Sequence, residues 1–264
     1  MSYRPLASQA GHVHVCGHRG HSVAAPENTL PALEGAAKHG ATVCEIDVVL
    51  TKDREIVLLH DEILDRTTDG RGCVGDLAAS EVAHLDAGSW FAPEFSGTRV
   101  PTLVQALEIS KDLGLALHVE IKERRRTDAL IDRLASVLTA TGATGDVLLI
   151  SFDHPSLVRA RERIPGLRTE LITHARHVDP VAMARRAGAA SVAIEWDMFH
   201  ADDAAALHGA HVAVRLTVPS PANLAGLRAC GIDPDAAIRK AVREGFVDIL
   251  AGDDVQKVAS WVRG

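Results

Sequence analysis

Short runs rich in β-branched residues and leucine alternate with alanine-rich amphipathic stretches along most of the chain. This alternation is typical of parallel strands that are each covered by a helix. The pattern amounts to about eight strand–helix units, which predicts an α/β fold of the (β/α)8 TIM-barrel type. Strands are predicted at Val13–Gly17, Thr42–Val48, Leu115–Ile121, Val147–Ser151, Arg168–Thr173, Ser191–Glu195, His211–Thr217 and Val247–Leu250. Helices are predicted near Leu30–His39, Leu103–Leu113, Thr127–Thr141, Pro155–Arg163, Pro180–Ala187, Ala201–His208 and Asp235–Glu244.

One segment interrupts the alternation. Glu62–Pro101 follows a short apolar run, Glu55–His60, and is rich in glycine, aspartate, threonine and serine. Long excursions from a barrel usually leave at the carboxyl ends of strands, where they help to build the pocket. We therefore expect a single barrel domain over residues 1–264, with a small inserted subdomain at about 62–101, after the second strand, that caps the site.

The composition excludes several classes of partner. The formal net charge of −7 is spread along the chain, so no basic surface for nucleic acid is expected. No segment approaches the roughly 20 apolar residues that span a bilayer, so no stable membrane insertion is expected. The four cysteines show no C-x-x-C spacing, which favours buried free thiols and a reducing, cytoplasmic location. The oligomeric state is left open.

Two predicted strands carry acidic residues on one face. Glu45 and Asp47 alternate with apolar residues, which places their side chains on the same side, roughly 6–7 Å apart. Glu120 and Lys122 repeat this spacing on the next long strand. Like-charged carboxylates repel unless a cation lies between them, and oxygen ligands favour Mg²⁺ or Ca²⁺. The pattern indicates one divalent cation, with Lys122 beside it for a phosphate oxygen.

Histidines follow two of the predicted strands. His18 and Arg19 stand between glycines at the end of the first strand, and His60 stands just before the inserted segment. Two histidines beside a metal and basic groups suit acid–base chemistry at a P–O bond. Asn28 and Thr29, which precede the first helix, are interpreted as candidate helix caps.

The ordered motifs resemble those of the glycerophosphodiester phosphodiesterases. The runs HRG, PENT, EIDV-x-x-TKD, HD-x-x-L-x-RTT, GSWF-x-x-x-F-x-G-x-x-VPTL and EIK occur in this order between His18 and Lys122. The resemblance covers about the first half of the chain and implies a TIM barrel and a hydrolase of lipid and glycerol metabolism. It also implies a divalent metal held by Glu45, Asp47 and Glu120, His18 and His60 as the acid–base pair, and phosphate contacts by Arg19 and Lys122.

The resemblance weakens toward the C-terminus. At the seventh strand, Val214–Thr217 keeps the family's threonine but lacks its tryptophan. In Gly245–Gly252 the family's usual Thr-Asp pair is replaced by Ala251 and Gly252. We therefore expect the alcohol end of the substrate to differ. The candidate replacements are Glu195 as a hydroxyl acceptor, Trp196 as an apolar wall and Arg215 as a charge for an anionic group.

These features predict metal-dependent hydrolysis of a small-molecule glycerophosphodiester by histidine acid–base catalysis. A sugar phosphodiester or a lysophospholipid is the alternative substrate, because the seventh and eighth strand ends are altered. A non-catalytic phosphodiester-binding barrel does not need an acid–base pair. A metal-dependent sugar isomerase or aldolase on the same barrel does not account for the ordered motifs.

Overall fold

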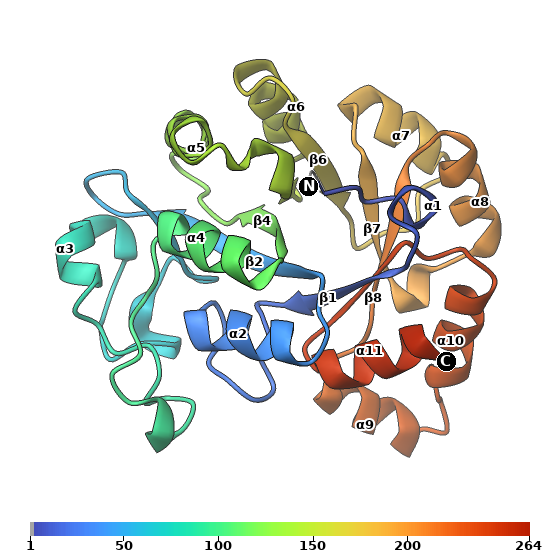
Figure 1. Cartoon of the computed structure of the whole chain (residues 1–264), viewed down its shortest axis with the longest axis horizontal. Coiled ribbons are helices and arrows are strands. Elements are labelled where there is room, and N and C mark those ends of the chain that lie inside the picture. Colours follow the sequence, from blue (N-terminus) through green and yellow to red (C-terminus); the bar gives the residue numbers. More distant parts are fainter. Residues whose placement is uncertain (1–2) are drawn as a thin grey trace.

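The computed structural model describes residues 3–264. Its single sheet has nine strands, of which all but β3 are parallel, and the pairing of β1 with β2 closes these parallel strands into a barrel (Figure 1). The predicted TIM barrel is therefore confirmed. The barrel strands are β1 (His14–His18), β2 (Val43–Leu50), β4 (Ala116–Ile121), β5 (Val147–Ser151), β6 (Arg168–Ile172), β7 (Ser191–Glu195), β8 (Ala213–Thr217) and β9 (Ile249–Gly252).

Helices surround the barrel on the outside (Figure 1). Four of the described helices were not predicted: the four-residue helices α1 (Ala7–Ala10) and α3 (Ala79–Val82), and the longer helices α9 (Pro221–Ala229) and α11 (Val255–Arg263). Pro221 and Gly226 obscure the helical pattern of α9, whereas α11 follows the last strand and packs against β1 and β9, where the barrel closes. The helices are α1 (Ala7–Ala10), α2 (Leu30–Lys38), α3 (Ala79–Val82), α4 (Leu103–Leu113), α5 (Thr127–Thr141), α6 (His154–Arg163), α7 (Pro180–Ala187), α8 (Ala201–Gly209), α9 (Pro221–Ala229), α10 (Asp235–Arg243) and α11 (Val255–Arg263).

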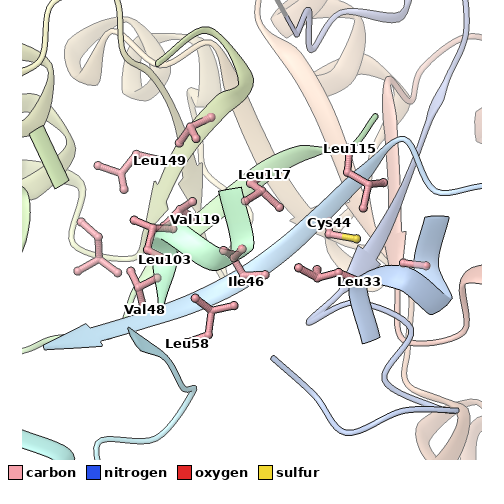
Figure 2. Packing of buried hydrophobic residues seen from close by; sticks show 14 of the residues in the cluster. Leu33, Cys44, Ile46, Val48, Leu58, Leu103, Leu115, Leu117, Val119 and Leu149 are labelled. Carbon is pink, nitrogen blue, oxygen red and sulfur yellow. The ribbon is translucent and has the colours of Figure 1, made fainter. Parts of the chain in front are cut away.

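The main hydrophobic core lies between the strands and this helical layer. Ile46 and Val48 of β2 are fully buried in the same apolar cluster as Leu103 of α4 (Figure 2). Each such side chain contributes about 1.5–3 kcal/mol when it leaves water. Because side chains alternate along a strand, Glu45 and Asp47 face the barrel interior instead. The packing of the outer face thus fixes which residues reach the site.

The segment at 62–101 forms a small unit beside the barrel (Figure 1). It begins after β3 (Ile56–Leu58), which pairs antiparallel with the end of β2. Its apolar cluster is formed by Val49, Val57, Leu59, Leu64, Val74, Val82, Ala87 and Val100. The Asp86 carboxylate accepts backbone N–H bonds from Gly88, Ser89 and Gly97. This segment is therefore stabilised by a small apolar cluster and by one loop that the Asp86 hydrogen bonds hold together.

The described cysteines are all free, but they are not all buried. Cys16 and Cys44 are buried in barrel strands, whereas Cys230 is exposed. The expectation of a buried thiol is thus wrong for Cys230, because this residue ends α9 on the outer surface, and Cys73 is only partly buried. Among the described helices, none combines the length and the apolar character that crossing a bilayer requires.

His208 of α8 and Asp248, just before β9, provide a prediction of pH-dependent stability. Nε2 of His208 lies 2.7 Å from Oδ2 of Asp248. This hydrogen bond raises the pKa of His208 despite partial burial. A pKa raised by folding stabilises the protein fully below the unfolded value of about 6.5, and this contribution is lost as pH rises through the folded value. We expect His208→Gln to cost roughly 1–2 kcal/mol at pH 5.5 and less at pH 8.5. Urea denaturation at the two values measures this, and an equal cost at both contradicts it.

Candidate active site

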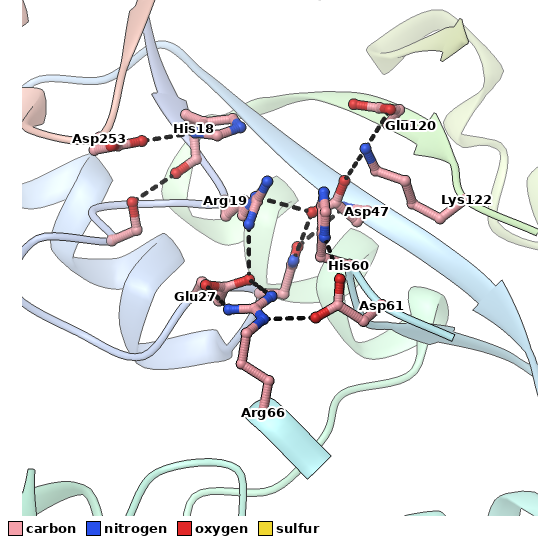
Figure 3. Close-up of polar contacts among 12 residues, drawn as sticks. His18, Arg19, Glu27, Asp47, His60, Asp61, Arg66, Glu120, Lys122 and Asp253 are labelled. Atoms are coloured by element: carbon pink, nitrogen blue, oxygen red, sulfur yellow. Dashed lines mark hydrogen bonds and ion pairs between the residues drawn. The ribbon is translucent and has the colours of Figure 1, made fainter. Parts of the chain in front are cut away.

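Acidic and basic side chains gather at the carboxyl ends of three neighbouring barrel strands (Figure 3). His18 ends β1, Glu45 and Asp47 lie on β2, and Glu120 lies on β4. Lys122 follows β4 and forms an ion pair with Glu120. The strand register pairs His18 with Glu45 and Asp47 with Glu120. The alternation read from the sequence therefore places these residues where the structure has them.

Three buried carboxylates form the centre of the site. Oxygen atoms of Glu45, Asp47 and Glu120 all lie within 4.8 Å of one another. Burial and the neighbouring Asp47 carboxylate raise the pKa of Glu45 to about 8. Its Oε1 atom is buried and has no hydrogen-bond partner among residues 3–264. Clustered oxygens with an unsatisfied buried acceptor fit a hard divalent cation.

Two cationic side chains neutralise part of this negative charge. Lys122 Nζ lies 3.3 Å from Asp47 Oδ1 and also contacts the Glu120 carboxylate. Arg19 Nε lies 3.2 Å from Asp47 Oδ2, and the Arg19 backbone N–H donates to Glu45 Oε2 at 3.0 Å. Burial opposes ionisation of Asp47, but Arg19 and Lys122 hold its pKa below the ordinary value. Asp47 is therefore kept as an anion.

The turn that carries Arg19 depends on glycine. A Cβ on Gly17 would lie 2.7 Å from the Gly20 carbonyl oxygen, and a Cβ on Gly20 would lie 2.6 Å from the Ala32 backbone. Gly20 has φ +84° and Arg19 itself has φ +58°. A left-handed conformation is costly for a residue with a side chain, and such strain is common at functional sites. The turn directs both the backbone N–H and the guanidinium of Arg19 at the carboxylates.

Asn28 orients Asp47 rather than capping a helix. Its Nδ2 donates to Asp47 Oδ2 at 2.7 Å, and its Oδ1 accepts from the Asp47 backbone N–H at 2.9 Å. The Thr29 hydroxyl donates to the Pro26 carbonyl instead of accepting from α2. The prediction that one of these side chains caps the helix is therefore wrong. Asn28 reaches Asp47 because its own φ is +57°.

Each predicted histidine is paired with a carboxylate. Nδ1 of His18 lies 2.6 Å from Asp253 Oδ1, and Nδ1 of His60 lies 2.7 Å from Asp61 Oδ1. Because a carboxylate only accepts, each Nδ1 carries the hydrogen. Burial lowers the pKa of His18, but Asp253 and Glu45 more than offset this, and the net pKa is raised. Nε2 of each ring is therefore the nitrogen that can exchange a proton with a substrate.

Asp253 corrects the interpretation of the last strand. The sequence comparison placed the family's terminal acid at Gly252 and therefore counted it as lost. The structure ends β9 at Gly252 and places the next residue, Asp253, against His18. An acid is therefore present directly after the strand, one residue beyond the position expected from the sequence.

A cavity of about 320 Å³ opens above the carboxylates. The predicted residues Glu195 and Arg215 both line it, whereas Trp196 does not and packs against the main core. Phe152, which no sequence motif singled out, supplies the aromatic ring of the cavity wall. The remaining lining residues are His18, Arg19, Glu45, His60, Glu120, Lys122, Ile172, His174, Thr217, Val218, Pro219, Ser220, Asn223, Gly252 and Asp253.

A wider groove of about 920 Å³ adjoins this cavity. It runs between the inserted subdomain and the ends of β4 and β5, and its wall includes Ile63 and Arg66. His60 and Phe152 line both the cavity and the groove, whereas His18 lines only the cavity. Of the two histidines, only His60 therefore borders the groove as well as the cavity.

Arg215 forms a buried ion pair beneath the cavity. Its Nε lies 2.7 Å from Glu170 Oε1, and the two side chains are 5% and 0% exposed. The Ser191 hydroxyl donates to the other Glu170 oxygen at 2.6 Å. Most of the charge of Arg215 is therefore matched within the barrel, so this residue offers N–H donors to the cavity more than net charge.

Removing one member of this pair is expected to destabilise the barrel strongly. Arg215→Met leaves the Glu170 carboxylate buried without its cation, which costs roughly 3–5 kcal/mol. The double variant Arg215→Met/Glu170→Gln removes the unpaired charge and should recover part of this loss. Urea denaturation of the wild type and the variants measures the free energy of unfolding. A double variant as unstable as the sum of the single variants contradicts the expected coupling.

Comparisons with known proteins agree with this geometry. Residues 18–234 match the model of the Glycerophosphoryl diester phosphodiesterase family. YhdW of Bacillus subtilis (strain 168) is 40% identical over 162 residues, which cover 61% of this chain and 66% of that relative. A glycerophosphodiester phosphodiesterase of Caldanaerobacter subterraneus subsp. tengcongensis is 37% identical over 179 residues, covering 67% of this chain and 74% of that relative. The matches thus span about two thirds to three quarters of these two relatives.

Solved structures are similar over nearly the whole length. An Oleispira antarctica phosphodiesterase in complex with the product sn-glycerol-3-phosphate has a TM-score of 0.84 and 27% identity, covering 97% of this chain and 99% of that chain. A glycerophosphodiester phosphodiesterase from Agrobacterium tumefaciens has a TM-score of 0.79 and 26% identity, covering 94% of this chain and 99% of that chain.

Proposed function

Because the chain belongs to the glycerophosphoryl diester phosphodiesterase family, we propose that it hydrolyses glycerophosphodiesters to an alcohol and glycerol phosphate. The observation that carries this proposal is the pair of carboxylate-bound histidines, His18 and His60, beside one buried cluster of three carboxylates. A protein that only bound a phosphodiester would need neither histidine. The similarity to a structure with bound glycerol phosphate supports the same end product.

The carboxylates Glu45, Asp47 and Glu120 are proposed to hold one divalent cation, Mg²⁺ or Ca²⁺. The bound cation would supply Lewis-acid stabilisation of the negative charge on the phosphoryl oxygens. Arg19 and Lys122 already contact these carboxylates, and each has N–H donors to offer to a phosphate. In this role they orient the phosphodiester and neutralise charge that develops during displacement.

His18 and His60 are proposed to divide the proton transfers. His60 borders the groove as well as the cavity, which supports a role in protonating an alcohol that leaves through the groove. In this scheme His18, which lines the cavity but not the groove, removes the proton from the attacking hydroxyl, either water or the glycerol 2-hydroxyl. Asp253 and Asp61 hold the two rings in the tautomer that leaves Nε2 free.

Glu195 and Arg215 are proposed to recognise hydroxyls at the glycerol end. The Glu195 side chain is 32% exposed and lines the cavity, where its carboxylate can accept from a hydroxyl. Arg215, with its charge matched by Glu170, donates from below. Trp196 has no part in this recognition, since it does not line the cavity.

The volume and the apolar wall of the groove favour a second class of substrate. Phe152 and Ile63 are 44% and 49% exposed, and both line it. A volume of about 920 Å³ exceeds what a small alcohol fills. Lysophospholipids and sugar phosphodiesters are therefore included among the candidates. Action in the cytoplasm stays a prediction from the sequence.

A panel of phosphodiesters tests the proposal. Glycerophosphodiesters, a lysophospholipid and a sugar phosphodiester are incubated with Mg²⁺, Ca²⁺, Mn²⁺ or chelator, and the products are identified by phosphorus NMR. We expect glycerol phosphate and free alcohol, with turnover abolished by the chelator. Turnover that persists in chelator, or absence of turnover with every diester and metal, contradicts the proposed function.

A further inference from the structure

Arg66 joins two carboxylates that belong to different parts of the site. It ends the short 3-10 helix Leu64–Arg66 in the inserted subdomain. Its two terminal nitrogens donate to the two Glu27 oxygens, each at 2.8 Å, and its Nε donates to Asp61 Oδ2 at 2.5 Å (Figure 3). One guanidinium therefore binds both Glu27 oxygens in a bidentate pair and reaches Asp61 with its third nitrogen.

Each of these two carboxylates also contacts a residue of the proposed machinery. Glu27 Oε1 also accepts from Arg19 Nη1 at 2.9 Å. Asp61 Oδ1 binds Nδ1 of His60 at 2.7 Å. Two continuous chains of charged hydrogen bonds thus run from Arg66, one to Arg19 on the phosphate side and one to His60. The residues at their ends come from the turn after β1 and the segment after β3.

The geometry of a guanidinium is necessary for this arrangement. Glu27 and Asp61 repel each other, and both lie beside one cation that presents donors in three fixed directions. A lysine ammonium is a point charge on a flexible stem and cannot reproduce the bidentate pair and the third bond together. Without Arg66, Asp61 loses the bond that fixes its plane, and the His60 ring loses its orientation.

We propose that Arg66 is a positioning residue that sets His60 and Arg19 relative to each other across the site. It forms no ion pair with a carboxylate of the central cluster, and it reaches Arg19 through Glu27 and His60 through Asp61. This inference rests on the proposed function for its kinetic consequence, but not for the orientation of His60. Its side chain is 44% exposed, so solvent screens these ion pairs and they contribute little to stability.

The first test is kinetic and uses Arg66→Gln. We expect kcat to fall roughly 10–100-fold, as when the partner that orients a functional side chain is lost. Arg66→Lys should recover only part of this loss. The control is Arg71→Gln, which removes the same charge from the same subdomain, where Arg71 is 81% exposed and forms an ion pair with Asp65. Equal activities of the two glutamine variants overturn the proposal.

The second test separates positioning from a general loss of structure. A diester with a p-nitrophenol leaving group needs little protonation, because the phenolate is a stable anion. Loss of His60 orientation should therefore slow an alkyl diester more than its p-nitrophenyl counterpart. Damage to the fold would instead lower both rates by the same factor and also lower the melting temperature. An equal fall in both rates at an unchanged melting temperature contradicts the role assigned to Arg66.

The third test does not require activity. Side-chain ¹⁵N NMR of the histidines reports the Nδ1 hydrogen bond of each ring. In Arg66→Gln we expect the His60 signals to move while the His18 signals, held by Asp253, stay in place. Unmoved His60 signals refute the positioning role. Moved His60 signals in a protein without phosphodiesterase activity uphold it and reject the proposed function instead.

Discussion

Replacement of His18 or His60 by asparagine is expected to lower kcat by roughly 10²–10⁴-fold for an alkyl diester. Each ring carries its hydrogen on Nδ1, toward a carboxylate, and leaves Nε2 for the substrate. Asparagine keeps a polar group of similar reach but does not exchange a proton near neutral pH. Because proton removal and leaving-group protonation are separate events, each single variant should be severely impaired.

The two variants are expected to differ in their response to the leaving group. His60→Asn should recover much of its rate with a p-nitrophenyl diester, whereas His18→Asn should not. His12→Gln is the matched control, because His12 is exposed near the N-terminal end of the chain and lies outside the cavity. Steady-state kinetics on both substrates measures the effect. Near wild-type turnover of either asparagine variant on the alkyl diester excludes the proposed acid–base pair.

The second large effect is expected at the carboxylate cluster. Asp47→Asn keeps the shape of the side chain and removes the charge that Arg19, Lys122 and the proposed cation share. Loss of several kcal/mol of transition-state stabilisation corresponds to a fall of about 10³-fold or more in turnover. Isothermal titration with Mg²⁺ and Mn²⁺ supplies a readout that is independent of catalysis, and binding should be lost.

Asp53→Asn provides the control for this experiment. Asp53 is an acidic residue near the same end of β2, but it binds Thr51 and the backbone of Ala79 rather than the cluster. This variant should bind the metal as the wild type does. Asp47→Asn with wild-type affinity for both metals would show that the cation, if used, is held elsewhere.

The sequence was most informative where one periodicity decided the answer. A period of two on β2 placed Glu45 and Asp47 on the inner face, because the outward residues Ile46 and Val48 had a helix to pack against. The parallel arrangement then brought the carboxyl ends of the strands together, so Glu120 fell beside them. The central cluster could therefore be predicted without knowledge of any loop.

Interactions that depend on loop conformation were not predictable in this way. Asn28 reaches Asp47 only because of a left-handed backbone, and Arg66 reaches Glu27 from a segment 39 residues away in the sequence. Asp253 was missed because an alignment one residue out of register moves an acid away from a strand end. No local pattern encodes such contacts, since they are set by how the turns fold back onto the barrel.

The pairing of His18 with Asp253 also bears on how activity arises during synthesis. These residues are separated by 235 positions, and they meet only when β9 docks between β8 and β1. A nascent chain whose first half has already folded on the ribosome would thus carry the carboxylate cluster without a fully oriented His18. The enzyme is expected to become active only when the barrel closes. The time at which activity appears during refolding should therefore coincide with docking of β9.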